Sequence, residues 1–333
     1  MQFLIRKIYR ILLPKRFREI ISDFIYRDRM ISLGNENPDK TFLIIRTFEK
    51  STGLGASITI AIRNIMYADK MGYIPIIDQM SIESQYHDKI AFGKDNAWEY
   101  YFEQPTAYNL ENISKSKNIV LCKNENGHKI DSFKHRNIAF EIYYFDKDIN
   151  GVILEYKKYF RQYIKFSKEV EKKMYGDYEN VLKGKGKILG VVGRGAEFIL
   201  KKPKNHRVVP EPNVLLDKVK EIFKQEKFDH IYLATEDNDI YLLFKDEFKE
   251  KLLDNDQKRV SSMDVKKHDY LSEVPFDYGE REKYKLGLDY LSSMYLLSKC
   301  NGICGGVVSA TVIAYIMSEG YEYQYFFDLG VYQ

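Results

Sequence analysis

Three groups of residues in the second half of the chain could together bind a diphosphate. They are Arg194 with Glu197, then Thr235, Glu236 and Asp237, and then Ser309, Ala310 and Thr311. Arginine supplies a fixed charge and a planar fork of donors, and a helix that begins near Ser309 supplies unpaired N–H groups. Carboxylates beside them can accept hydrogen bonds from ribose hydroxyls or a base. Together the groups indicate a nucleotide-diphosphate site, although each alone is also explained by a helix cap or a surface carboxylate.

Two glycines, Gly193 and Gly195, flank Arg194. Glycine leaves room for a ligand to approach the backbone, and the guanidinium group suits a phosphate. The alternative interpretation is a strand-to-helix turn whose arginine is solvated or paired with a carboxylate. Both interpretations stand for this turn alone, so the elements around it must decide between them.

Strands and helices alternate around these residues. We expect strands at 188–192, 230–235 and 302–306, and helices at 214–225, 285–298 and 309–317. Apolar runs bounded by glycine or polar residues are typical of buried parallel strands, and ligands of open α/β sheets lie beyond the carboxyl ends of such strands. The pattern predicts a doubly wound, Rossmann-like domain over residues 184–333 that binds the nucleotide.

A second Rossmann-like domain is expected over residues 28–183. A strand at 41–47, a turn with Gly53 and Gly55, a helix at 58–71 and a strand at 73–78 form one βαβ unit. The turn lacks the dinucleotide glycine pattern, which argues against bound NAD or FAD. We expect it to admit an acceptor substrate, with Asp78 at the end of the second strand. Charged helices between residues 151 and 182 and a glycine-lysine linker complete this domain.

Trp98, the single tryptophan, lies in an aromatic cluster at residues 96–105. Such a cluster could form a platform for a sugar ring, because the C–H groups of a pyranose pack on aromatic faces. The alternative is a locally packed structural element. Both interpretations remain open at this point.

Composition and charge exclude several classes of protein. Apolar residues make up 44% and charged residues 30%, which is typical of a soluble globular protein, and the net charge of +4 argues against a nucleic-acid partner. Cys122, Cys300 and Cys304 cannot all pair, and no secretory signal is recognisable, so we expect a cytoplasmic protein. Cys300 and Cys304 lack two further ligands for zinc, and we expect them in the core and no metal site.

Residues 1–27 form a basic amphipathic segment. Its apolar run is too short and too charged to cross a bilayer. Residues 2–18 could instead lie on the inner face of the cytoplasmic membrane, with arginine and lysine near lipid phosphates. The alternative is a helix docked on the body of the protein.

Three motifs resemble those of the fucosyltransferase-like superfamily, which includes the α-1,6-, α-1,2- and protein O-fucosyltransferases and the Nod-factor enzymes. The matching segments are residues 192–197, 232–237 and 296–309. Val192 stands where the family has histidine, Gly195 where many members have a second arginine, and Glu197 where the family has aspartate.

The resemblance implies a GT-B fold, in which two Rossmann-like domains face across a cleft, with the donor in the C-terminal domain and the acceptor in the N-terminal one. It implies metal-independent transfer with inversion, no cofactor, and a nucleotide-sugar donor that is GDP-linked. Arg194 falls on the arginine that binds the donor β-phosphate, and His206 lies where some members have a histidine in the downstream loop. Glu197 and Asp78 are both candidates for the base that accepts the acceptor's proton.

The sequence therefore favours a glycosyltransferase that moves fucose or a related sugar onto a glycan or glycolipid, in synthesis of a bacterial surface polysaccharide or glycolipid. Two other interpretations remain open. One is a polysaccharide pyruvyl transferase, which uses the same general architecture with another donor. The other is a catalytically silent nucleotide- or glycan-binding protein, consistent with Val192 in place of histidine.

Overall fold

The computed structural model describes residues 29–46, 52–81, 84–87, 93–121, 142–147, 151–204, 206–265, 274 and 281–333. The basic segment 1–27, with its expected membrane contact at residues 2–18, and Cys122 lie outside the described residues. The side chain of Glu197 lies outside them as well.

The first half of the chain forms a sheet around the expected βαβ unit. Within the described residues its strand order is β1-β4-β2-β3, with β2 parallel to both β3 and β4 and β1 antiparallel to β4. The strands are β1 (Arg29–Ile31), β2 (Glu36–Ile45), β3 (Ile74–Ile77) and β4 (Ser116–Leu121). Helix α3 (Leu54–Met71) crosses from β2 to β3 and ends at Gly72, whose positive φ of 69° favours glycine at the C-cap. The helix begins earlier than expected, so Gly55 lies in its first turn rather than in an open loop.

The second half forms an all-parallel sheet with strand order β7-β6-β5-β8-β9. The strands are β5 (Ile188–Val192), β6 (His230–Ala234), β7 (Leu252–Leu253), β8 (Gly302–Gly306) and β9 (Tyr323–Phe327). Val192 pairs with Ala234 on one side and with Gly305 on the other, so the ends of these three strands lie at one edge. The chain builds β6 on one side of β5 and β8 on the other, and the crevice at such a reversal is where open α/β sheets bind ligands.

Helices flank this sheet and begin close to its carboxyl edge. They are α8 (Ala196–Lys201), α9 (Pro212–Gln225), α10 (Asn238–Phe248), α11 (Ser262–Val265), α12 (Glu282–Ser298) and α13 (Ser309–Met317). Pro212 occupies the first turn of α9, where its missing N–H costs no hydrogen bond. The apolar stripe of α9 packs with strands β5 and β6 in one buried cluster.

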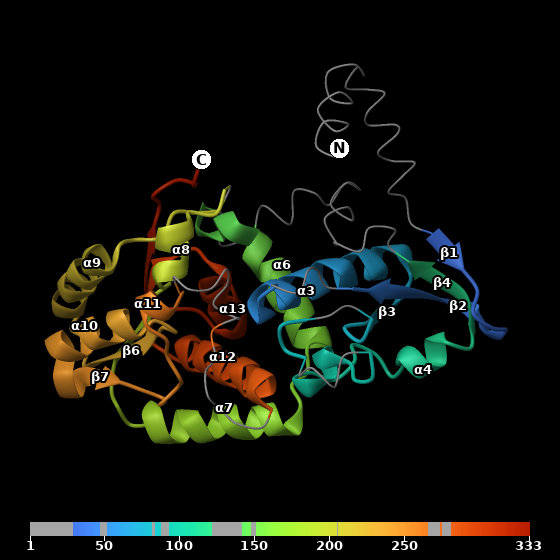
Figure 1. The fold of residues 1–333 in the computed structure, drawn as a ribbon, viewed down its shortest axis with the longest axis horizontal. Helices are drawn as coiled ribbons and strands as arrows, with labels where there is room; N and C mark the ends of the chain where they lie inside the picture. Colours follow the sequence, from blue (N-terminus) through green and yellow to red (C-terminus); the bar gives the residue numbers. More distant parts are fainter. Residues whose placement is uncertain are drawn as a thin grey trace, which may run out of the picture.

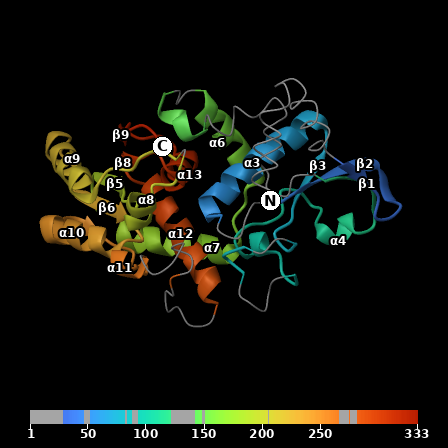
Figure 2. The ribbon, with the colours of Figure 1, turned by 45° about the horizontal axis from the view of Figure 1, so that its top comes forward.

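Two helices lie between the halves. Helix α6 (Val152–Tyr163) contacts both α3 and α13, and α7 (Lys168–Val181) runs along α12. Figure 1 shows the first sheet on the right, the second on the left, α6 between them, and α7 along the bottom beneath α12. Figure 2 shows the same arrangement from a turned view. The largest buried cluster draws apolar side chains from both halves, including Leu43, Ile62, Leu297 and Ile313.

The predicted α/β class with two Rossmann-like, parallel-rich halves is confirmed, with one antiparallel edge strand in the first sheet. Short elements without a strong pattern were not expected: strands β1, β7 and β9, helix α4 (Leu110–Ile113), and 3-10 turns at Ala97–Tyr100, Ile142–Lys147 and Lys249–Lys251. The expected domain boundaries, including the assignment of residues 151–182 to the first half, stay predictions.

Because one buried cluster joins both halves, we predict that they unfold together in urea. Trp98 fluorescence reports on the first half and far-UV circular dichroism on the whole chain, and the two curves should coincide. Leu297→Ala, at a fully buried position in the cluster, should lower the unfolding free energy by about 2–5 kcal/mol in both signals. The control is Leu154→Ala on the half-exposed face of α6, which should change it by less than about 0.5 kcal/mol. Separate transitions for the two signals would contradict the shared core.

Candidate functional site

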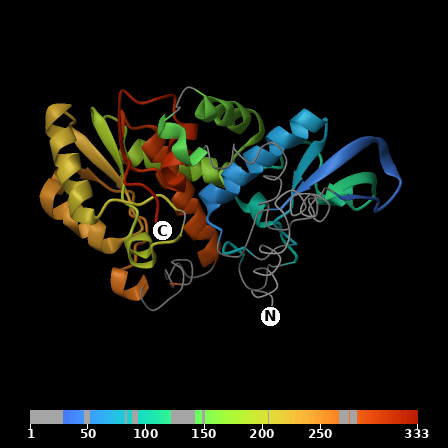
Figure 3. The same cartoon turned by 90° about the horizontal axis from the view of Figure 1, so that it is seen from above.

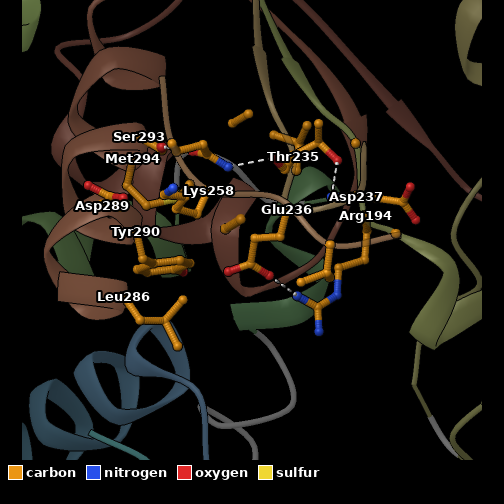
Figure 4. Close-up of a pocket in the computed structure, with 17 residues that line it drawn as sticks. Arg194, Thr235, Glu236, Asp237, Lys258, Leu286, Asp289, Tyr290, Ser293 and Met294 are labelled. Atoms are coloured by element: carbon orange, nitrogen blue, oxygen red, sulfur yellow. Dashed lines mark hydrogen bonds and ion pairs between the residues drawn. The ribbon is translucent and has the colours of Figure 1, made fainter. Parts of the chain in front are cut away.

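A pocket opens at the carboxyl edge of the second sheet. Among the predicted site residues, its wall includes Gly193, Arg194, Gly195, Thr235, Glu236, Asp237 and Ala310. Figure 4 shows that Arg194 and Asp237 lie across this pocket from Leu286, Tyr290 and Met294. At least one residue of each group that the sequence singled out therefore lies at this pocket: Arg194, residues 235–237, and Ala310.

Arg194 is held by two contacts. Its Nη1 lies 3.7 Å from Oε2 of Glu236, and its Cζ lies 4.6 Å from the centre of the Phe198 ring. The side chains of Arg194 and Glu236 are each about one-third exposed, at 32% and 31%. A partly exposed ion pair of this kind contributes little to stability, so an anionic ligand that enters the pocket can replace Glu236 beside the guanidinium at small cost.

Of the two glycines beside Arg194, close packing requires the one at position 195. Gly193 donates its N–H to the carbonyl of Ala234 at 3.0 Å. A Cβ atom at Gly195 would lie 2.7 Å from Cβ and Oδ2 of Asp237, closer than real Cβ atoms approach their neighbours. No larger side chain fits at position 195 while Asp237 keeps its place.

Asp237 caps helix α10. Its Oδ1 accepts hydrogen bonds from the backbone N–H groups of Asp239 at 2.8 Å and Ile240 at 3.2 Å. The Thr235 hydroxyl accepts the N–H of Asp237 at 3.1 Å, and both side chains are buried. In this pocket Asp237 and Thr235 shape the wall. Of the three neighbouring residues 235–237, Glu236 is the one whose side chain reaches the opening.

Helix α13 begins differently from the expected Ser-Ala-Thr cap. Val308 is the N-cap and provides no side-chain hydrogen bond, and Ser309 is the first helical residue. Thr311 is fully buried and donates its hydroxyl hydrogen to the carbonyl of Gly306. Ala310 lines the pocket and Ser309 is half-buried. The first-turn N–H groups of α13 thus lack a side-chain cap, while Thr311 has a structural role.

The loop at residues 254–260 forms a wall that the sequence did not reveal. Arg259 holds it in place, with Nη2 at 2.6 Å from Oδ1 of Asp254 and its guanidinium stacked 3.9 Å from the Tyr241 ring. Arg259 lowers the pKa of Asp254 against the opposing effect of burial. Gln257 and Lys258 then line the pocket. The loop carries no periodic pattern, so no sequence signal marks it as part of a site.

Helix α12 supplies the opposite wall, and sequence reasoning missed it too. Its pocket residues are Leu286, Asp289, Tyr290, Ser293 and Met294. Ser293 is buried and donates to Oε1 of Gln257, which in turn donates to the carbonyl of Thr235. The available signal was the Ser292-Ser293 pair between Leu291 and Met294, because hydroxyls that an apolar stretch buries need partners.

His206 lies near Arg194 but not in the pocket wall. Its ring meets the Phe198 ring edge-on at 5.6 Å between centroids, so Phe198 lies between the histidine and the guanidinium. Partial desolvation, and secondarily the positive charge of Arg194, lower the pKa of His206. The ring is therefore mostly neutral at pH 7. Glu197 belongs to the first turn of helix α8, as does Phe198.

Two residues expected on the acceptor side are structural. Trp98 is fully buried and packs on Phe102 at 4.3 Å between ring centroids, so neither face is open to a sugar. The packed-element interpretation of the aromatic cluster is the correct one. Asp78 is 2% exposed and is engaged by Arg46 Nε at 2.9 Å and by the N–H groups of Met80 and Ser81. A carboxylate so occupied has no place for a substrate proton, which removes Asp78 as a base.

Gly53 and Gly55 differ from each other. Gly53 is the exposed N-cap of α3 with open space beside its Cα. Gly55 is buried against the Tyr290 hydroxyl, Ser309 and Ile313 of the second half. The turn therefore does not present an open entrance at Gly55, because protein atoms fill that side.

Cys300 and Cys304 are buried with free thiols, and burial raises the pKa of both. Their expected core position is confirmed. Across the described part of the chain, no three His, Cys, Asp or Glu side chains gather as metal ligands. Nor does any described helix combine the length and apolar character needed to cross a bilayer.

The fold and site define a class: an α/β protein with a cation-bearing pocket at the carboxyl edge of a parallel sheet. No protein-family model and no curated protein sequence matches the chain. Solved structures of fucosyltransferases are similar to it at low identity. NodZ α-1,6-fucosyltransferase soaked with GDP-fucose has a TM-score of 0.49 and 16% identity, over 84% of this chain and 93% of that one.

Two further similar structures belong to other fucosyltransferases. For a mutant of Arabidopsis thaliana FUT1 in complex with GDP, the TM-score is 0.43 and the identity 12%, over 85% of this chain and 69% of that one. For POFUT1 in complex with GDP, the TM-score is 0.43 and the identity 10%, over 87% of this chain and 99% of that one. A NodZ structure from Bradyrhizobium gives 0.48 and 15%, over 84% of this chain and 94% of that one.

The Arg194–Phe198–His206 arrangement predicts a measurable titration. By NMR, His206 should titrate below the ordinary histidine pKa, and Arg194→Gln should raise its pKa part of the way back, because desolvation remains after the charge is removed. Since the folded-state pKa is lowered, this group makes stability rise with pH from the folded pKa up to the unfolded value near 6.5. The control is Arg161→Gln on α6, where the arginine pairs with Glu319. This change should leave the pKa of His206 unchanged. A His206 pKa at or above about 6.5 would contradict the arrangement.

Proposed function

We propose that this chain is a glycosyltransferase that binds a GDP-linked sugar in the pocket at the carboxyl edge of the second sheet. The observation that carries the proposal is the meeting of Arg194, Glu236 and the start of α13 in one pocket with an apolar wall. The cation and the uncapped helix N-terminus suit a diphosphate, and Tyr290, Leu286 and Met294 provide apolar surface for the rest of a nucleotide.

In this proposal the protein stabilises the leaving group. As the bond between the sugar and the diphosphate breaks, negative charge grows on the β-phosphate, and Arg194 is the residue proposed to compensate that charge. An anionic ligand would compete with Glu236 for the guanidinium, at a small cost because their ion pair is partly exposed. Glu197 is the proposed base for the acceptor hydroxyl, since Asp78 is engaged in the first half of the chain.

The transferred sugar is fucose or a related sugar, and the acceptor is a glycan or glycolipid of a bacterial surface polymer. The motif resemblance supports this part of the proposal. The pyruvyl transferase and the silent binding protein remain the alternatives, and they differ in which ligand the pocket takes and whether transfer follows.

Calorimetry with GDP, UDP and CDP tests the proposal. GDP should bind most tightly, and Arg194→Ala should weaken its binding by roughly 10- to 100-fold, the effect of losing one charge-assisted interaction with phosphate. Arg161→Ala removes a surface arginine elsewhere and should leave binding unchanged. Binding of none of the three nucleotides would refute a nucleotide site, and GDP binding without hydrolysis or transfer of GDP-fucose would favour the silent binding protein.

We also propose that the protein works at the cytoplasmic face of the membrane, held there by residues 2–18. The basic, amphipathic sequence of this segment supports the proposal. Deletion of residues 1–27 should move the protein from the membrane fraction to the soluble fraction, and high salt should do so in part because the attraction to anionic lipid is screened. Unchanged fractionation of the deletion variant would refute the membrane contact.

A further inference from the structure

Two tyrosines pack against two glycines across the boundary between the halves. Tyr101 of the first half lies against Gly287 of α12, where a methyl group would overlap the Tyr101 hydroxyl and ring. In the opposite direction, Tyr290 of α12 lies with its hydroxyl against Gly55 of α3, where a methyl group would overlap that hydroxyl. Gly287 and Tyr290 are one helical turn apart, so they lie on the same face of α12.

Hydrogen bonds and ring contacts fix the first of these pairs. The Tyr101 hydroxyl donates to the carbonyls of Lys283 at 3.2 Å and Tyr284 at 3.0 Å, in the first turn of α12. The Tyr101 ring is also stacked on the Tyr284 ring, with centroids 5.4 Å apart and planes 14° apart. Tyr101 itself is fully buried.

The residues of the first half that contact α12 are connected to one another through Tyr86. The Tyr86 hydroxyl accepts the N–H of Leu54 at 2.7 Å, which fixes the first turn of α3 beside Gly55. The Tyr86 ring meets the Tyr101 ring edge-on at 5.8 Å between centroids. The two points that touch α12 are therefore linked to each other through Tyr86.

The same helix is the wall of the pocket. Leu286, Asp289, Tyr290, Ser293 and Met294 line it, and the lining residues within the described part of the chain come from the second half. Figure 3 shows α3, in light blue, meeting the orange-red α12 at the centre of the molecule. The first half thus contacts Tyr290, a residue that would touch a nucleotide, and Gly287, one helical turn away.

We propose that the reciprocal Tyr101–Gly287 and Gly55–Tyr290 contacts position α12, so that binding in the pocket and docking of the first half onto α12 are thermodynamically coupled. This inference deepens the proposed function and rests on it for the identity of the ligand. Gly55, Gly287 and Tyr101 are positioning residues in this scheme, because they act through α12. Coupling of this kind is reciprocal: a nucleotide that stabilises the α12 wall also stabilises the docked state of α3.

The test combines calorimetry with hydrogen-deuterium exchange on the full chain, with GDP as the probe. GDP should slow exchange in the first turns of α3 in the wild type, although the described lining residues of the pocket belong to other elements. Gly55→Ala should remove that response and weaken GDP binding roughly 2- to 30-fold. The matched control is Gly176→Ala in α7, another helical glycine, which has open space beside it and should change neither quantity.

A rescue separates positioning from a general loss of structure. Tyr290→Phe removes the hydroxyl that an alanine at position 55 would meet, so the double variant Gly55→Ala/Tyr290→Phe should bind GDP more tightly than the two single effects predict. If Gly55→Ala does not fold, Tyr101→Phe provides the second route, because it keeps the ring and removes only the hydrogen bonds to α12. Tyr101→Phe should then weaken GDP binding and reduce the α3 response.

The outcomes distinguish this inference from the proposed function. If the wild type binds no nucleotide, the proposed function fails, and exchange without ligand still tests the docking. In that arm Gly55→Ala should speed exchange at residues 286–294 of α12, and Gly176→Ala should not. Unchanged exchange there, or GDP binding by Gly55→Ala and Tyr101→Phe that equals the wild type, would overturn the coupling.

Discussion

The parallel pairing of β5 with β6 and β8 is the constraint on which the rest of the molecule depends. Because Val192 pairs with Ala234 and Gly305, residues far apart in the chain leave the sheet at the same height and at the same edge. Arg194, Glu236 and Ala310 follow these strands within a few residues, so the register alone brings them to one place. A shift of one residue in either pairing would turn the strand's side chains to the other face of the sheet and displace the turn that follows the strand.

The packing behind the edge decides what each polar group can do. Asp237 and Thr235 are buried, and their side chains accept hydrogen bonds from backbone N–H groups at the start of α10. Both residues therefore form part of the pocket wall. Glu236, between them in sequence, points outward to Arg194 at 3.7 Å. Alternation along an extended chain thus separates one carboxylate that faces the pocket from two structural neighbours, although all three share one motif.

Sequence patterns predicted the parts of this site that belong to regular elements. The strands β5 and β8 and the helix α3 follow from apolar runs and glycine boundaries, and so does the edge that carries Arg194. The loop with Gln257 and Lys258 could not be found in this way, because an irregular segment is placed by specific contacts such as Arg259 with Asp254 rather than by periodicity. Trp98 shows the opposite error. An aromatic cluster is compatible with both a binding platform and a core, and only burial distinguishes them.

Gly55 and Gly287 show why the two halves cannot be understood separately. From sequence, Gly55 belongs to a turn that could receive a substrate, and Gly287 is merely a weak position in a helix. Each is explained by a tyrosine from the other half, which occupies the space that a side chain would need. Helix propensity alone would favour alanine at position 287, so packing against Tyr101 is the physical reason for glycine there. The wall of the pocket is accordingly built by the second half and held in position by the first.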